Sequence, residues 1–380
     1  MGEMREKDDG EGMSGTREEL TGVPGLARLV VVDRTGSTND DLRSALTGVD
    51  GRLDLRATAA WPHISALWAR RQDAGRGRAG HRWITPPGSA LTVSFVLRPL
   101  VPAAALAWLP LLAGLAARDV VDAILISARA PWRARTKWPN DVVLVPNERA
   151  GEGIAAGAGV GIGVGEGTGS GAGAAAVPVP AEIPGWGRAR KVAGVLAELI
   201  PTAGGIGARA SAGTTGTADA SGAVAAGAAD APGAVGAAGA PGAAGADRGA
   251  ACAVVLGIGV NTGQSESELP VPWATSLRLA GARVEPRALL ELLSARLDEL
   301  VTAWEAGEGD PDAGDGALGA ALRRACTTLG RRVRVDAPGG VLRGTAVDIA
   351  PGLVLRGADG TMRTVDAGDV SHVRTDGAVD

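Results

Sequence analysis

Two segments made almost entirely of small residues divide this chain of 380 residues and limit which parts of it can form a core. Residues 151–187 are dominated by Gly and Ala, and residues 201–250 contain 33 Ala or Gly in 50 positions. Ordering the backbone costs about 1–2 kcal/mol per residue, and such side chains bury too little apolar surface to offset that cost. We therefore predict flexible loops for both segments and a disordered tail for the polar residues 1–24, which leaves 269 residues for the folded part.

The rest of the chain predicts an α+β fold in which a mixed sheet with helices precedes a small all-β module. Apolar residues at spacings of three and four favour a helix that opens at Pro286 and reaches Trp304. Further helices are predicted over residues 40–46, 103–126 (with a weak point at Pro110) and 318–329. Strands are predicted over residues 26–32, 64–69, 91–97, 192–200 and 252–260, and residues 137–145 combine a loop and a strand.

The last 50 residues change in character. Short β-like runs separated by Gly and Pro turns occupy residues 331–335, 342–348, 353–355 and 361–365. A run of this length suits a compact β-barrel. We therefore place one domain at residues 25–328, with the two small-residue segments as insertions, and a second domain at residues 329–376.

Composition excludes several classes of function. The formal net charge of −4 gives the whole chain no positive footprint for nucleic acid. Two cysteines without CxxC spacing and three histidines without a ligand-spaced pair argue against a disulfide scaffold and a zinc site. We therefore expect any metal to be Mg²⁺ held by carboxylates and phosphate, and we name no protein residue as a metal ligand. The N-terminus lacks the apolar region of a signal peptide, and the uncharged stretch 100–117 contains two prolines, which favours a buried helix over a membrane span. We expect a cytoplasmic protein that binds neither membrane nor nucleic acid.

The most informative segment is residues 72–83, with the sequence QDAGRGRAGHRW. Its GRGRAG matches the GxGxxG pattern of dinucleotide-binding folds, but that pattern needs a helix to begin at the glycines. Here the sequence continues as WITPPG, which cannot form the first turns of a helix, so we reject that interpretation. Glycines beside Arg76, Arg78 and Arg82 favour an anion-binding loop. On these residues alone, a solvated basic loop and a nucleic-acid contact remain open.

Three further segments combine polar groups with turns or glycines. KWPND at residues 137–141 places a cation, an amide and a carboxylate on a rigid turn. RKVAGVLAE at residues 190–198 leads from Lys191 into an apolar strand, where Gly194 permits close approach of a ligand. LGIGVN at residues 256–261 is a strand with two glycines that ends in an amide. Taken singly these signals are weak, because a lysine at a strand start usually faces solvent and strand glycines are more often packing features.

In this order the segments resemble the successive signature segments of the biotin–protein ligase family. The resemblance begins with the Ser37-Thr38-Asn39 triplet and continues through the 72–83 loop, KWPND, RKVAGVLAE and the glycine-containing strand. It extends over residues 28–100, 133–145, 188–200 and 252–305 and the C-terminal β module. The loop together with KWPND and RKVAGVLAE is its specific part.

The resemblance implies a fold, a reaction and a partner. The fold combines a mixed β-sheet with flanking helices, similar to the catalytic domain of class II aminoacyl-tRNA synthetases, with a small C-terminal SH3-like β-barrel. The reaction uses ATP with Mg²⁺ to convert biotin into biotinyl-5′-adenylate and then transfers biotin to a lysine of a biotin carboxyl carrier domain of an acyl-CoA carboxylase, such as acetyl-CoA carboxylase. The resemblance allows a homodimer. The 24-residue tail is shorter than a winged-helix domain, so we expect a ligase without the repressor function of some members.

The resemblance also implies roles for individual residues. The catalytic residues would be Lys191, Arg78 and Asp141, with Asp141 as the candidate that accepts or orients the proton of the carrier lysine. The biotin-binding residues would be Ser37, Thr38, Asn39, Gln72, Gly75, Arg76, Gly77, Arg78, Lys191 and Gly194. The nucleotide-binding residues would be Arg78, Gly80, Trp83, Lys137, Asn140, Lys191 and Asn261. The loop over residues 75–83 is expected to order over the adenylate and to exclude water.

The chain departs from the family pattern at two places. His81 stands where the family usually has the last arginine of its loop, and 37 residues rich in Gly and Ala separate the KWPND strand from Lys191, where the family has a short turn. The second departure therefore affects how Lys191 is positioned in the site. Two alternatives remain: the lipoate ligases and octanoyl transferases, which lack this GRGRxG loop, and a non-catalytic RNA-contacting module, which would show salt-sensitive binding and would not need Lys191.

Overall fold

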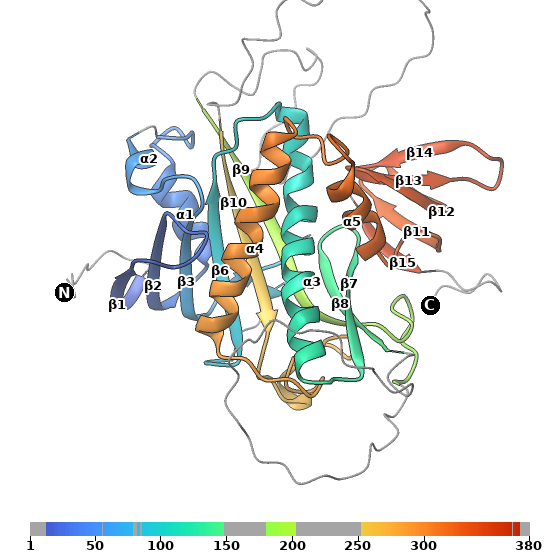
Figure 1. Cartoon of the computed structure of the whole chain (residues 1–380), viewed down its shortest axis with the longest axis horizontal. Coiled ribbons are helices and arrows are strands. Elements are labelled where there is room, and N and C mark those ends of the chain that lie inside the picture. The colour runs from blue at the N-terminus through green and yellow to red at the C-terminus, as the bar shows by residue number, and fades with distance from the viewer. Residues whose placement is uncertain are drawn as a thin grey trace, which may run out of the picture.

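The computed structural model describes residues 13–54, 56–78, 82–83, 86–147, 180–202, 252–366 and 368–372. An eight-stranded sheet in the order β1-β2-β3-β6-β10-β9-β8-β7 forms its centre (Figure 1). The strands are β1 (Met13–Leu20), β2 (Arg28–Thr35), β3 (Ser65–Gln72), β6 (Ala90–Leu97), β7 (Trp132–Lys137), β8 (Asp141–Pro146), β9 (Arg190–Pro201) and β10 (Cys252–Asn261). Neighbouring strands are antiparallel except for β2 and β3, so the sheet is mixed.

Each face of this sheet has its own hydrophobic core. On β2, Leu29 and Val31 belong to the larger core, whereas Val30 and Val32 belong to a smaller one. Successive side chains of a strand point to opposite faces, so this alternation means that both faces are covered. Every residue of the central strand β6 is buried, as a position between two covered faces requires.

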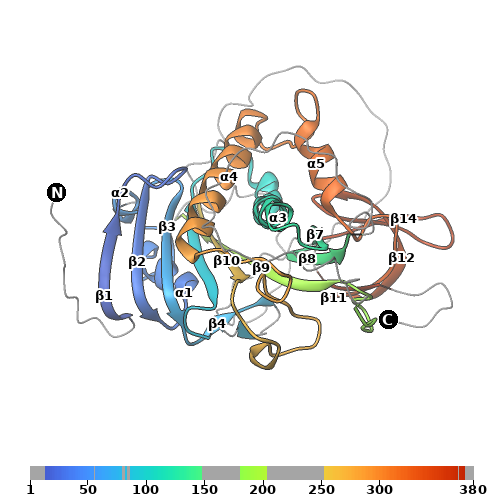
Figure 2. The same ribbon diagram turned by 60° about the horizontal axis from the view of Figure 1, so that its bottom comes forward.

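Helices lie on both faces of the sheet (Figure 2). The helices α3 (Leu109–Ser127), α4 (Pro286–Ala306) and α5 (Ala317–Ala325) lie on the face of the larger core. The apolar residues of α4 at spacings of three and four are buried, which confirms the helix predicted from them. On the other face α1 (Thr38–Leu46) contacts β3, β6 and β10 and contributes Leu42 and Leu46 to the smaller core, next to the short α2 (Ala57–Ala60).

A five-stranded antiparallel sheet forms the C-terminal domain, in the order β14-β13-β12-β11-β15. Its strands are β11 (Arg332–Ala337), β12 (Gly340–Ala350), β13 (Gly352–Arg356), β14 (Met362–Val365) and β15 (Asp369–His372). Contacts that attach it to the larger domain include the pair of Arg323 of α5 with Asp348 of β12 at 2.6 Å and the bond from Lys137 Nζ to the carbonyl oxygen of Val370 at 2.8 Å. The predicted α+β class with a small C-terminal β domain is confirmed.

Outside the small-residue segments, the structure differs from the sequence-based expectations at the following places. Residues 13–20, which we expected within a disordered tail, form β1, because backbone pairing with β2 and the Arg28–Glu19 ion pair at 2.9 Å hold them at the sheet edge. The helix expected over residues 103–126 is instead a 3-10 turn (Ala103–Trp108) followed by α3, and Pro110 lies in the first turn of α3, where a missing N–H costs little. The strands β7 and β15 were not predicted.

The small-residue segments are described only at their ends. Residues 180–187, which we expected within the first flexible loop, form a turn in which the Ile183 N–H donates to the Gly187 carbonyl at 2.8 Å. Residues 151–179 and 203–250 lie outside the described residues. The prediction of flexible loops is therefore wrong for residues 180–187, because a closed hydrogen-bonded turn orders them.

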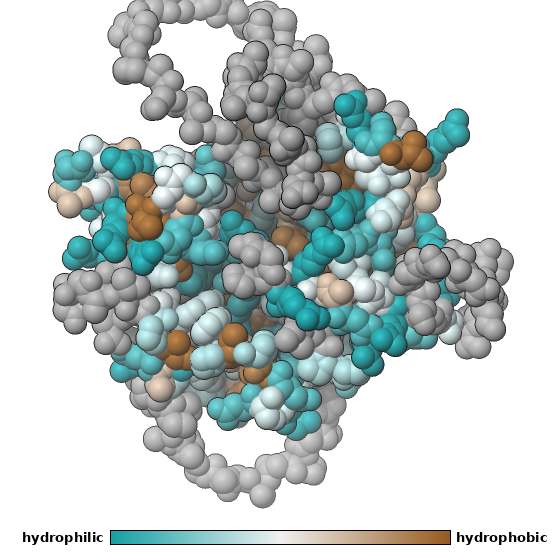
Figure 3. Space-filling model, turned by 180° about the vertical axis from the view of Figure 1, so that it is seen from behind, coloured by the Kyte–Doolittle hydropathy of each residue, from teal (hydrophilic) through white to brown (hydrophobic). Residues whose placement is uncertain are grey.

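The surface carries its hydrophobic residues in small groups. Seen from behind, these groups are separated by hydrophilic residues (Figure 3). Among the helices that the structure describes, none combines the length and the apolar character that a membrane span needs.

Candidate functional site

A cavity of about 450 Å³ opens on the face of the sheet that carries α1. Its walls come from the start of α1, the loop after β3, the strands β9 and β10, the loop over residues 262–285, the KWPND turn and β15. Of the residues predicted for the site, those that line it are Ser37, Thr38, Asn39, Gln72, Arg76, Gly77, Arg78, Trp83, Lys137, Asn140, Asp141, Lys191, Gly194 and Asn261. The structure thus brings together segments that are far apart in the sequence.

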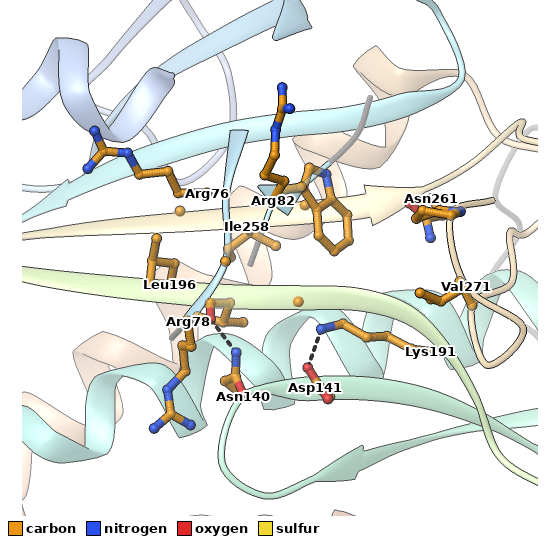
Figure 4. A pocket seen from close by; sticks show the side chains of 18 of the residues that line it. Arg76, Arg78, Arg82, Asn140, Asp141, Lys191, Leu196, Ile258, Asn261 and Val271 are labelled. Atoms are coloured by element: carbon orange, nitrogen blue, oxygen red, sulfur yellow. Dashed lines mark hydrogen bonds and ion pairs between the residues drawn. The ribbon is translucent and has the colours of Figure 1, made fainter. Parts of the chain in front are cut away.

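Lys191 and Asp141 face each other inside the cavity (Figure 4). The antiparallel pairing of β8 with β9 brings Lys191 Nζ to 2.5 Å from Asp141 Oδ1. The Lys191 backbone is fixed on its other side, since its N–H donates to the Trp273 carbonyl at 2.7 Å and its carbonyl accepts from the Thr275 N–H at 2.8 Å. Lys191 is therefore held in place by sheet pairing, although a long segment separates it from Asp141 in the sequence.

Two glycines make room for the indole of Trp83. Gly194 on β9 and Gly259 on β10 lie opposite each other in the sheet. A Cβ at Gly259 would lie 2.5 Å from a Trp83 ring carbon, and a Cβ at Gly194 would lie 3.3 Å from the same ring and 3.2 Å from Lys191 Nζ. The sequence suggested that Gly194 lets a ligand approach, whereas in the structure the space is filled by Trp83, whose ring lies 5.7 Å from Lys191 Nζ.

The Gly/Arg loop forms a small hairpin beside the cavity. Its described parts, β4 (Gly75–Arg76) and β5 (Arg82–Trp83), pair with each other. Gly75 does not line the cavity, but a side chain there would collide with the Gln72 amide and the Trp83 carbonyl, so the hairpin requires a glycine. Gly80 and His81 lie outside the described residues.

The three arginines of this loop point in different directions. The guanidinium groups of Arg76 and Arg82 point away from Lys191 (Figure 4), and Arg76 pairs with Asp40 of α1 at 3.1 Å. Arg78 is partly buried, and burial lowers the pKa of its guanidinium, with Asp369 and Asp141 acting in the opposite direction. The structure therefore brings Arg78 toward the carboxylates of the cavity and leaves Arg76 paired with α1.

The predicted amides already have partners within the protein. The Asn140 side chain donates to the Val195 carbonyl at 2.8 Å. Asn261 donates to the Thr275 carbonyl at 2.9 Å and accepts from the Gln264 amide at 2.9 Å. These bonds position the KWPND turn and the loop after β10, and contact of either amide with a nucleotide stays a prediction.

Sequence reasoning missed an aromatic wall of the cavity. The rings of Trp186 and Trp273 stack with centroids 5.9 Å apart and planes inclined by 12°. Lys137 Nζ lies 3.9 Å from the centroid of the Trp186 ring, a cation–π contact. Trp186 escaped notice because it ends the Gly/Ala-rich segment, and only its being a tryptophan among small residues marked it.

Lys137 is a buried cation, with 6% of its surface exposed. Burial lowers its pKa to about 8; Asp141 and Asp369 oppose this shift, and Lys191 adds to it. An unfolded lysine titrates near 10.4, so between pH 8 and 10.4 the unfolded chain binds the proton that the folded chain has lost. The free energy of unfolding should therefore rise with pH across this window, by up to about 3 kcal/mol from this group.

We expect Lys137→Met to abolish that rise. The test is urea unfolding of the wild type and the variant at pH 7.5, 9 and 10.5. Background titration is small, because the chain has no tyrosine and only two other lysines, and any contribution of the cysteines cancels in the difference between the two proteins. A difference in unfolding free energy that stays constant with pH would rule out the low pKa of Lys137.

The fold and the cavity together define a class of α+β protein. A mixed sheet, followed by a small β domain, carries a pocket that is lined by cations, carboxylates and uncharged polar side chains. The family described as "Biotin/lipoate A/B protein ligase family" matches residues 53–209, and the "Biotin protein ligase C terminal domain" matches residues 328–373. The chain belongs to the biotin/lipoate A/B protein ligase family.

Known proteins support this membership. The biotin–(acetyl-CoA-carboxylase) ligase of Mycobacterium tuberculosis is 28% identical over 363 residues, 94% of each chain. The protein of the same name from Paracoccus denitrificans is 37% identical over 118 residues, 31% of this chain and 42% of its own length. A mutant of the biotin protein ligase from Aquifex aeolicus, in complex with biotin, has a TM-score of 0.50 at 19% identity, covers 91% of this chain and 98% of its own, and supports the fold alone.

Proposed function

We propose that this protein is an ATP-dependent biotin–protein ligase that forms biotinyl-5′-adenylate and transfers biotin to a lysine of the biotin carboxyl carrier domain of an acyl-CoA carboxylase. One observation carries the proposal: Thr38, Gln72, Arg78, Asp141 and Lys191 come from four separate segments and line one cavity. The named relatives, which are biotin–(acetyl-CoA-carboxylase) ligases, support the same substrate and partner.

In the first step an oxygen of the biotin carboxylate attacks the α-phosphorus of ATP, an O–P bond forms, and pyrophosphate leaves. Two anions must approach each other, so the site has to supply positive charge. Lys191 and Arg78 are the cations that the geometry offers for this, since both line the cavity and both are partly buried. At 4 Å one unit-charge pair contributes about 4 kcal/mol at an effective dielectric constant of 20, against about 1 kcal/mol in water.

In the second step the neutral amine of the carrier lysine attacks the acyl carbon of the adenylate, a C–N bond forms, and AMP leaves. The attacking lysine must lose a proton, and its ordinary pKa is near 10.4. We propose that the carboxylate of Asp141 accepts that proton. The ion pair with Lys191 holds this carboxylate in the cavity. General-base catalysis of this kind typically contributes 10²- to 10⁴-fold.

We propose that Mg²⁺ enters with the phosphates of ATP. Among the residues that the structure describes, no group of three or more His, Cys, Asp or Glu side chains is placed to hold a metal. Asp141 is engaged by Lys191, and the other carboxylates that line the cavity are Glu268 and Asp369. Phosphate oxygens are the usual ligands in such a case, and the ion neutralises phosphate charge.

The other assignments follow from the same cavity. We propose a ligase domain at residues 25–328 and a C-terminal β domain at 329–376. We propose that biotin contacts Ser37, Thr38, Gln72 and Gly77, and that the nucleotide lies toward Trp83, Lys137, Asn140 and Asn261. The contribution of Gly80, a homodimer and a cytoplasmic location stay predictions; light scattering tests the dimer.

The direct test is labelling of a carrier. The purified protein is incubated with biotin, MgATP and a biotin carboxyl carrier domain, and the carrier is probed for bound biotin. We expect labelling that depends on ATP and stops when the acceptor lysine of the carrier is replaced. Labelling of the carrier with lipoate but not with biotin would move the protein to the sister activity within its family.

A further inference from the structure

Trp186 and Trp273 present two flat aromatic rings to the cavity, and both residues are only partly buried. The rings stack with centroids 5.9 Å apart and planes inclined by 12°. A third flat ring between them would need about 7 Å, because each pair of stacked carbon surfaces requires about 3.5 Å. A ligand ring that packs on the inner face of either indole therefore has to displace the other indole.

The Trp273 ring belongs to a segment that is fixed beside the proposed reaction centre. The Trp273 carbonyl accepts the N–H of Lys191 at 2.7 Å, and Ala274 pairs with Lys191 as in a parallel sheet. Lys191 in turn reaches Asp141 inside the cavity. An aromatic face next to a cation suits a nucleotide, whose flat base stacks on aromatic side chains while its phosphates need positive charge. The Trp273 ring is therefore a surface on which the base of a nucleotide can pack.

The Trp186 ring is held less firmly than the turn that carries it. Trp186 lies on the closed turn 183–187, and the Arg190 guanidinium fixes the flanks of this turn by donating to two backbone carbonyls at 2.6 and 3.0 Å. The ring itself is held by its stack on Trp273 and by Lys137 Nζ, 3.9 Å from its centroid. Rotation about the side-chain torsions breaks both contacts and leaves the backbone bonds intact. The ring can therefore leave Trp273 without a change in the fold.

We propose that Trp186 determines the nucleotide affinity of the site, because its indole occupies on Trp273 the place that the base of ATP takes when it binds. This inference rests on the proposed function, since the ligase reaction is what brings ATP into the cavity. Binding then exchanges one stack for another, and only those molecules in which the Trp186 ring has left Trp273 can accept the base. The same ring competes with the base of AMP and so favours release of this product.

The first test is calorimetry with biotin present and an ATP analogue whose α,β-bridging oxygen is replaced by methylene, so that pyrophosphate cannot leave. Trp186→Ala removes the competing ring, and we expect it to bind the analogue about tenfold more tightly than the wild type, the strength of one aromatic pair. Trp273→Ala should bind the analogue more weakly. Adding Trp186→Ala to Trp273→Ala should bring no gain, because the ring then covers nothing. Trp186→Phe keeps an aromatic ring on Trp273 and should stay close to the wild type.

Inorganic tripolyphosphate is the control ligand, since it has the phosphates of ATP and no base. Its affinity should be the same for the wild type and for Trp186→Ala. An equal gain for tripolyphosphate and for the analogue would overturn the inference, because the ring would then act on the phosphates. Binding of the analogue by Trp186→Ala that is unchanged or weaker than in the wild type would overturn it as well, because the ring would then not compete with the base.

The second test follows the ring itself. Two stacked indoles give an exciton couplet in far-ultraviolet circular dichroism, and the difference between the wild type and Trp186→Phe isolates it. The analogue should remove this couplet with the affinity that calorimetry measures, and a couplet that persists at saturation overturns the displacement. Binding of the analogue by none of the proteins, all shown to be folded by urea unfolding, would overturn the proposed function and the inference with it. Binding by all of them without a gain in Trp186→Ala would overturn the inference alone.

Discussion

Replacing Lys191 by alanine is expected to lower kcat/KM for adenylate formation by about 10³-fold, the loss of one cation in a partly dry site where two anions meet. Lys191 is the site cation whose position the structure defines best, through sheet pairing and through its ion pair with Asp141 at 2.5 Å. The readout is single-turnover formation of biotinyl-5′-adenylate. Lys191→Arg should recover part of the rate, because it keeps the charge but not the point-like geometry of the ammonium.

The matched control is Arg188→Ala. Arg188 lies three residues upstream, outside the cavity, with half of its side chain exposed and Glu182 at 3.7 Å. We expect no more than a twofold change for this variant, and urea unfolding should show both variants folded. Adenylate formation at the wild-type rate by Lys191→Ala would contradict the electrostatic role assigned to Lys191.

Asp141→Asn is expected to separate the two steps of the reaction. Transfer of biotin from preformed adenylate to the carrier should fall by about 10²-fold or more at neutral pH, because the attacking amine loses its proton acceptor. The defect should shrink as the pH rises toward the pKa of the carrier lysine, where the amine deprotonates without help. Transfer is measured by rapid quench with a fixed excess of carrier.

Asp366→Asn, an exposed carboxylate after β14, provides the control and should transfer biotin as the wild type does. Full adenylate formation and full transfer by Asp141→Asn would eliminate Asp141 as the proton acceptor. A defect in transfer that is independent of pH would instead assign Asp141 to holding Lys191.

The sequence allowed the fold class to be predicted, and most of the site residues predicted from it line the cavity, for physical reasons that individual elements illustrate. The helix α4 was predictable because its buried leucines recur at helical spacing, and β10 because a run of apolar residues ends in Asn261. The rejection of a dinucleotide site rested on the prolines after Trp83, and the described part of the loop is a hairpin.

What could not be predicted depends on contacts between distant segments. The edge strand β1 is polar and is ordered by pairing with β2, which no local pattern reveals. Trp186 enters the cavity because a closed turn and the stack on Trp273 place it there. The direction of the Arg76 side chain depends on Asp40 of α1, 36 positions earlier in the sequence. Each case requires knowledge of which surfaces meet, and a single sequence lacks that information.

Biotin-dependent exchange of labelled pyrophosphate into ATP tests the central claim most directly, because it reports adenylate formation without any carrier. The structure predicts exchange that requires biotin, is not supported by lipoate, and is lost in Lys191→Ala but kept in Arg188→Ala. Exchange with neither acid, by protein that urea unfolding shows to be folded, would contradict the assignment of this cavity to acid activation.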